Sequence, residues 1–228
     1  MLELPTLPWT RPLSRLGIKK AINIRKPPAV KTQRKRGRPK KGETVPPTEK
    51  SGVARLLPMT PGRMQKGLPR DCSWGAKTNS QGKYEVWKGY KLHVSVVDGG
   101  LPVACLLTSA SLHDSQAAPF LLKKTAQTVQ GYCLADAAYD AASLQSLSKG
   151  LGIVPLIDKN PRKGGKTPME PDRERRYKAR TQVERFFARL KDEFGGRTIF
   201  VRGNKRVMAH LMFGVLAILA DRLLKSVT

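Results

Sequence analysis

Residues 84–108 constrain the fold more than any other stretch of the sequence. The run Y-E-V-W-K-G-Y-K-L-H-V-S-V-V, from Tyr84 to Val97, alternates as a long half-buried strand does. Asp98-Gly99-Gly100 supplies residues that tight turns favour, and the apolar run from Leu101 to Thr108 follows directly. The sequence therefore predicts a long β-hairpin over this stretch.

Helices and strands alternate after the hairpin. Ser111 or Asp114 can cap a helix that runs to about Thr125. The later predictions are a short buried strand at Tyr132–Ala135, a helix opening at Asp140–Ala142, a buried strand at Ile153–Ile157, a helix at Tyr177–Lys191 and an apolar helix at Met208–Leu224. This order predicts an α/β fold in which a central mixed sheet is flanked by helices on both faces.

The helix predicted at Tyr177–Lys191 reads Y-K-A-R-T-Q-V-E-R-F-F-A-R-L-K and contains no Gly or Pro, while Gly195-Gly196 would end it. At about 100° per residue, a stripe roughly 60° wide holds four polar or charged side chains. They are Tyr177, Arg180, Glu184 and Lys191, beside an apolar face of Val183, Phe186, Phe187, Leu190 and Phe194. From the helix alone, Glu184 is either an ordinary i,i+4 partner of Arg180 or a ligand for a hard cation that faces a polyanion.

The charge of the chain indicates a polyanionic partner. Lys and Arg number 43 against 17 Asp and Glu, a formal net charge of +26, which favours nucleic acid or a membrane surface. The longest apolar run, Leu211–Ala220, is about half of what a membrane span needs, and the first residues lack signal-peptide features. Cys72, Cys105 and Cys133 are odd in number and widely spaced, as in a reducing compartment. We therefore expect a cytoplasmic, nucleoid-associated protein that binds DNA and no membrane.

Residues 1–70 are predicted to be an irregular lead-in before an ordered domain at 71–228. Leu16–Arg25 alternates as a possible first strand, and a basic, Pro-rich segment that we expect to be disordered begins at Lys26. Within it, Arg36-Gly37-Arg38-Pro39 resembles an AT-hook, whose arginines enter a narrow A·T minor groove. The alternative is a basic linker that contacts phosphate without sequence preference. Glu43–Leu68 is linker-like.

Asp136 follows an apolar strand, at the edge where open α/β sheets bind ligands. A turn or N-cap role is the alternative. Because Asp136 and Glu184 come from different elements of one basic unit, the two carboxylates favour a bound divalent cation such as Mg²⁺. Such a site performs phosphoryl transfer.

Four stretches resemble the C-terminal part of an insertion-sequence DDE transposase, in the branch marked Y-x2-R-x3-E-x6-K. Tyr177, Arg180, Glu184 and Lys191 match that pattern at every spacing. The other stretches are L-A-D-A-A-Y-D around Asp136, W-K-G-Y-K-L-H in the hairpin, and L-T-S-A-S-L-H-D-S-Q at Leu107–Gln116. The resemblance covers about Arg15 to Thr228 and is strongest after Asp71.

This resemblance implies a ribonuclease H-like fold, Mg²⁺ or Mn²⁺, and strand cleavage and transfer at transposon ends and target DNA. Asp136 would be the second acid and Glu184 the third, both as metal ligands. Tyr177, Arg180 and Lys191 would contact phosphates of the transposon end, and a homodimer on DNA would be compatible.

The first acid is where the chain departs from the family. Relatives with a basic insertion should carry it in a D-[ST]-T-A-I stretch, but Ile18-Lys19-Lys20-Ala21-Ile22 has no acid. Either Asp71, the nearest upstream carboxylate before the hairpin, is the first acid, or the chain is a truncated, inactive copy that lacks it. Two other functions stay open: a non-enzymatic DNA-binding protein that uses the basic segment, and a ribonuclease or repair nuclease.

Overall fold

The computed structural model describes residues 52–78, 81–128, 131–160 and 168–227. All of these residues belong to one compact unit. The possible strand at Leu16–Arg25 and the AT-hook-like core Arg36–Pro39 lie outside the described residues.

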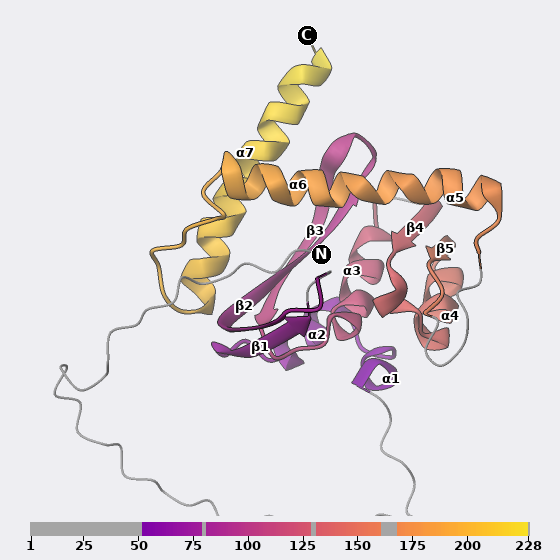
Figure 1. Ribbon diagram of the computed structural model, residues 1–228, viewed down its shortest axis with the longest axis horizontal. Coiled ribbons are helices and arrows are strands. Elements are labelled where there is room, and N and C mark those ends of the chain that lie inside the picture. Colours follow the sequence, from indigo (N-terminus) through magenta and orange to yellow (C-terminus); the bar gives the residue numbers. More distant parts are fainter. Residues whose placement is uncertain (1–51, 79–80, 129–130, 161–167, 228) are drawn as a thin grey trace, which may run out of the picture. The chain divides into compact units, whose positions relative to one another are not determined.

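The predicted hairpin is confirmed (Figure 1). Strand β2 (Tyr84–Val97) pairs antiparallel with β3 (Leu101–Ser109) from Tyr90 opposite Ser109 to Val97 opposite Leu101. The short 3-10 turn η2 (Asp98–Gly100) joins them, and its Gly99 and Gly100 adopt φ values of 77° and 76°. Glycine adopts this left-handed conformation without the steric cost that other residues meet, which explains the two glycines of the turn.

Three elements precede the hairpin, and the first two lie where the sequence indicated a linker. Helices α1 (Gly52–Leu56) and α2 (Pro61–Gly67) bury Val53, Leu56 and Met64. Strand β1 (Ser73–Thr78) pairs antiparallel with the first half of β2. Pro61 stands at the start of α2, where a helix tolerates proline because the first N–H groups have no partner within the helix. Proline therefore marked a helix start here.

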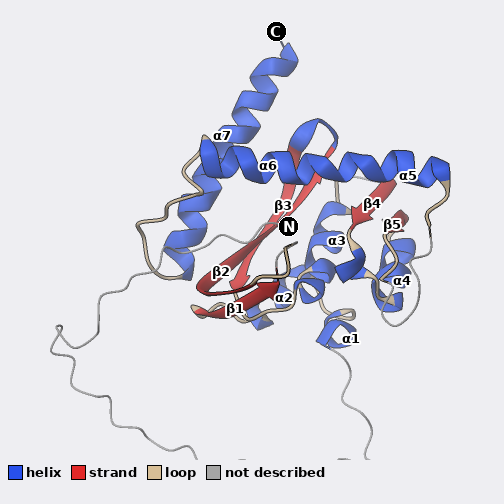
Figure 2. Ribbon diagram, viewed as in Figure 1, coloured by secondary structure: helices blue, strands red, loops and turns tan. Residues whose placement is uncertain are grey.

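A second sheet follows the hairpin. Strands β4 (Gly131–Ala135) and β5 (Ile153–Ile157) pair in parallel, joined by α4 (Ala142–Gly150). In the described part of the chain the strands thus form two hydrogen-bonded sheets, β1-β2-β3 and β4-β5. Antiparallel and parallel strands flanked by helices confirm the mixed α/β class (Figure 2).

The start of helix α3 (Ala118–Thr125) differs from the prediction. Neither Ser111 nor Asp114 caps it: its N-cap is Ala117, which makes no side-chain cap bond. The 3-10 turn η3 (Asp114–Gln116) comes first, and the imidazole of His113 accepts a hydrogen bond from the Ser115 N–H. Asp114 instead pairs with Lys91 of β2 at 3.2 Å, so a tertiary ion pair displaced the local cap.

The predicted helix at Tyr177–Lys191 is confirmed and begins earlier. Helix α5 (Pro171–Tyr177), the 3-10 turn η5 (Lys178–Arg180) and α6 (Thr181–Asp192) follow one another without a break. Gly195, at φ 72°, and a hydrogen bond of 2.7 Å from the Gly196 N–H to the Leu190 carbonyl end the helix as predicted.

The apolar face of α6 packs against β2 and the last helix, α7 (Asn204–Val227). This core contains Leu92, Val94, Phe186, Phe187, Leu190, Val207, Leu211, Val215 and Ile218. Between the two helices, a Cβ atom at Gly214 would lie 2.7 Å from Leu190 Cδ1 and from the Phe194 carbonyl oxygen. Gly214 therefore permits the close approach of α7 to α6.

Helix α7 is longer than the helix Met208–Leu224 that the sequence predicted. Among the described residues, the segment Asn204–Lys225 is the one helix long and apolar enough, by length and composition, to cross a membrane. Core helices of soluble proteins meet the same criterion. Val207, Leu211, Val215 and Ile218 of α7 are buried in the protein core, whereas Phe213, Leu216, Leu223 and Leu224 of the same helix are exposed.

Candidate functional site

Asp136 lies one residue beyond the end of β4. Its carboxylate accepts a hydrogen bond of 3.0 Å from the Ala138 N–H and caps the short 3-10 turn η4 (Ala137–Tyr139). The strand-end position and the N-cap role predicted for this residue thus occur together, and Asp136 is exposed.

A cavity of about 490 Å³ lies beside Asp136. One wall comes from the end of β2, a second from α3, a third from β4 and β5, and a fourth from the α5–α6 run. Asp136, Arg176, Arg180 and Gln182 supply polar groups to a mainly apolar lining. The fold thereby brings Asp136 and Arg180, which the sequence placed on separate elements, to one cavity.

Two contacts fix α5 on the β4–β5 sheet. The Arg173 guanidinium donates to the Pro155 carbonyl of β5 at 3.3 Å, and the Arg176 guanidinium lies 4.5 Å from the centre of the Tyr132 ring on β4. A cation over an aromatic face is attracted by the electrons of the ring. These contacts set where the chain enters α6, and therefore where Tyr177 and Arg180 lie.

Tyr177, Arg180 and Glu184 contact one another in sequence. The Arg180 guanidinium lies 5.7 Å from the centre of the Tyr177 ring and 3.0 Å from Glu184 Oε1. Burial raises the pKa of Tyr177; Arg180 opposes this shift, while Asp158 and Asp136 add to it. The phenol is therefore protonated at neutral pH and can donate a hydrogen bond. Lys191, also on α6, is half-buried and is not among the described residues that line the cavity.

Asp158 is a carboxylate that the sequence reading missed. It follows β5 as Asp136 follows β4, and its N–H donates to the Ala135 carbonyl at 3.3 Å. Because Ala135 pairs with Ile157 in the parallel sheet, the two aspartates follow a pair of adjacent residues. The sequence signal for both residues is an apolar strand followed directly by Asp, and this pattern occurs twice.

Asp71 is not among the residues that line the cavity beside Asp136. It is exposed and precedes β1. Burial raises the pKa of Tyr90, and Cys72 and Asp71 add to this shift. Within the described ranges, the structure contains no cluster of three or more His, Cys, Asp or Glu residues that could hold a metal ion.

A family model described as "Transposase DDE domain" matches residues 60–220. Neither the curated proteins nor the solved structures contain a significant match. The matched residues include the hairpin, Asp136 and the whole Tyr177–Lys191 helix, and they exceed half of the chain. The chain therefore belongs to the transposase DDE domain family.

Proposed function

We propose that this chain is the transposase domain of an insertion sequence and that it binds DNA, with transposon ends and target DNA as its partners. The observation that carries the proposal is that Asp136 and Arg180 line one cavity, while Arg180 also holds Glu184. The formal net charge of +26 supports a polyanionic substrate.

The side chains around the cavity suit phosphate. Arg180 offers a guanidinium, and the protonated Tyr177 offers a hydroxyl donor. Lys191 would extend the contact along α6, and Arg36-Gly37-Arg38-Pro39 would add an A·T minor-groove contact. A homodimer on DNA and association with the nucleoid are further parts of this proposal.

The family implies Mg²⁺ or Mn²⁺, which when bound activates a water or a 3′-hydroxyl for attack on phosphorus. The described residues do not fit such a centre. Asp136 and Glu184 supply two carboxylates, no third ligand completes a cluster with them within the described ranges, and Glu184 is paired with Arg180 at 3.0 Å. We therefore propose that this chain binds DNA and does not cleave transposon ends.

Two assays test this proposal. The affinity for a DNA duplex should fall steeply with salt, because each neutralised phosphate releases counterions. A supercoiled plasmid incubated with the chain and Mg²⁺ or Mn²⁺ should stay intact. Metal-dependent nicking that disappears in Asp136→Ala would overturn the inactive assignment, and its additional loss in Asp71→Ala would make Asp71 the first acid.

The Arg180–Glu184 ion pair also favours a second candidate, a non-enzymatic DNA-binding protein in which the basic segment provides the affinity. A double variant Arg36→Ala/Arg38→Ala distinguishes DNA binding by the basic segment from DNA binding by the α6 surface. If it abolishes binding while Arg180→Ala leaves the affinity unchanged, the basic segment is the binding site. If Arg180→Ala alone weakens binding, the α6 surface takes part.

A further inference from the structure

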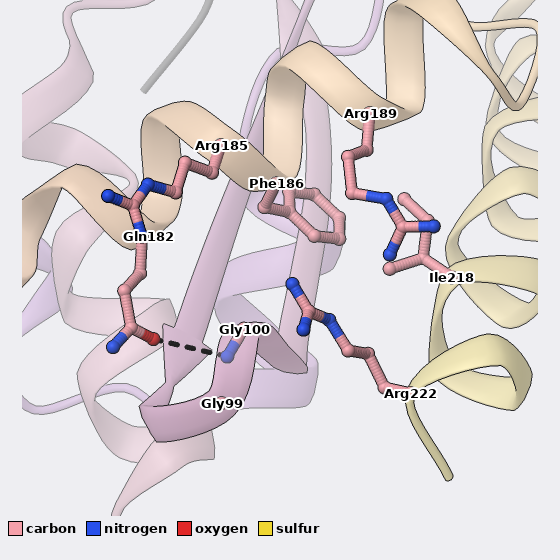
Figure 3. A pocket seen from close by; sticks show the side chains of 8 residues that line it. All are labelled: Gly99, Gly100, Gln182, Arg185, Phe186, Arg189, Ile218 and Arg222. Carbon is pink, nitrogen blue, oxygen red and sulfur yellow. Dashed lines mark hydrogen bonds between the residues drawn. The ribbon is translucent and has the colours of Figure 1, made fainter. Parts of the chain in front are cut away.

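A second, smaller cavity of about 140 Å³ lies between the hairpin turn and the helices α6 and α7 (Figure 3). Three arginines line it: Arg185 and Arg189 from α6, and Arg222 from α7. The turn contributes Gly99 and Gly100. No carboxylate lines this cavity, so its lining concentrates positive charge in a space large enough for one tetrahedral anion.

The three guanidinium groups differ in what neutralises them. Arg189 is fully engaged: it binds Glu193 at 2.8 Å and Asp221 at 2.9 Å. Arg185 and Arg222 form no ion pair with any residue in the described ranges, and the Nε of Arg222 is buried there without a hydrogen-bond partner. Because an unpaired buried donor costs free energy, an acceptor that reached this Nε–H would lower that cost.

The hairpin turn is shaped to admit Arg222. A Cβ atom at Gly100 would lie 3.4 Å from the terminal nitrogen Nη2 of Arg222, so glycine lets the guanidinium approach the backbone of the turn closely. The Gly100 N–H donates to Gln182 Oε1 at 3.1 Å, which fixes the turn against α6. The cavity is therefore assembled from three elements that are each held in place.

We infer that Arg185, Arg222 and the Gly99–Gly100 turn form a phosphate pocket that holds a backbone phosphate of bound DNA. A guanidinium binds phosphate oxygens through parallel N–H donors, and Arg185, which is exposed, offers such donors here. Gln182 lines both this pocket and the larger cavity beside Asp136. The phosphate would thus belong to the DNA strand that passes the Asp136 cavity.

The inference rests on the proposed function for the source of the phosphate, since free phosphate offers the same chemistry. The first test compares Arg185→Gln/Arg222→Gln with Lys205→Gln/Arg206→Gln in the full chain. The control pair removes the same charge from exposed side chains at the start of α7. The pocket variant should bind a DNA duplex at least about tenfold more weakly, with the salt slope reduced by about 1, and the control should change neither. Arg185→Gln alone, at an exposed side chain, repeats the test if the double variant does not fold.

The second test follows the amide signals of Gly99 and Gly100 in the ¹⁵N-glycine-labelled chain during titration with duplex DNA or with inorganic phosphate. DNA should shift both signals. If the chain binds DNA while the chemical shifts of both amides stay unchanged and the pocket variant keeps its affinity, the pocket is refuted and the proposed function stands. If phosphate alone shifts them, DNA is not the source. If the chain binds no DNA at all, the proposed function fails, and only a phosphate-induced shift would preserve an anion pocket.

Discussion

The guanidinium of Arg180 lies 3.0 Å from the carboxylate of Glu184. Both side chains are partly exposed, so the pair itself contributes little to folding. Its consequence concerns binding, because each partner reduces the charge that the other presents to a ligand.

Glu184→Gln should therefore strengthen DNA binding. It removes one negative charge and releases Arg180 toward phosphate, so we expect affinity to rise severalfold at low salt while stability changes by less than about 0.5 kcal/mol. Fluorescence anisotropy and urea denaturation measure the two effects. Glu174→Gln, at an exposed position of α5, removes the same charge elsewhere, and an equal gain in that control would show that net charge alone is responsible.

Gly214→Ala should destabilise the protein by about 1–3 kcal/mol, because the added methyl group would meet Leu190 Cδ1 and the Phe194 carbonyl oxygen at 2.7 Å. Gly62→Ala is a matched control in α2, where a Cβ atom would meet nothing within 4 Å. There the same change should be neutral or stabilise by up to about 1 kcal/mol, since alanine favours the helix. Thermal denaturation of both variants gives the comparison, and equal effects would contradict the close approach of α6 and α7.

Acid should weaken the fold partly through His93. Burial lowers the pKa of His93 to about 4; Lys91 adds to this shift and Asp114 opposes it. Between pH 6.5 and 4 the unfolded chain therefore takes up a proton that the folded chain does not, and stability falls as the pH falls, by up to roughly 3 kcal/mol. His93→Gln, which can still hydrogen-bond Thr108, should lose less stability over this range in urea denaturation. An equal loss in the variant would assign the effect to other groups.

The three cysteines should differ sharply in reactivity. Cys72 is exposed, whereas burial raises the pKa of the Cys105 thiol to about 12 and of the Cys133 thiol to about 11. A thiol-specific reagent at pH 8 should modify one thiol quickly, and Cys72→Ser should remove that fast phase. A fast phase that survives in Cys72→Ser would show that Cys105 or Cys133 is accessible.

The two buried thiols should also affect stability in alkali. Above about pH 9 Cys105 and Cys133 ionise in the unfolded chain before they ionise in the folded chain, so stability should fall as the pH rises.

Local patterns predicted the hairpin and the α5–α6 helix because their information lies within one segment. The alternation of Tyr84–Val97 and the turn Asp98–Gly100 specify the hairpin, and the apolar spacing of Phe186, Phe187 and Leu190 specifies the buried helix face. The short elements before Asp71 were missed because proline at a helix start looks like proline in a linker.

Non-local features were out of reach of such patterns. The separation of the strands into two sheets depends on pairing between distant residues. Arg185 and Arg222 line one cavity only because α7 packs on α6, and Asp158 follows the strand beside that of Asp136 only through the register of β4 with β5. Lys91 displaced a local cap by pairing with Asp114. In each case a tertiary contact decided the outcome.

The two sheets share no strand pairing within the described ranges, and α3 packs toward both of them. Its Phe120 and Leu121 pack in the core of the hairpin side, while Ala118 and Leu122 pack with Tyr139 and Leu144 on the side of α4. Side-chain packing, without a continuous ladder of backbone bonds, thus joins the β4–α4–β5 segment to the rest. We therefore expect that segment to open as a local unit while the hairpin stays closed, and its amides to exchange with solvent deuterium before those of β2 and β3. Because Asp136 and Asp158 follow the two strands of this segment, its opening would move both carboxylates together, and Asp136 would leave the cavity that it lines.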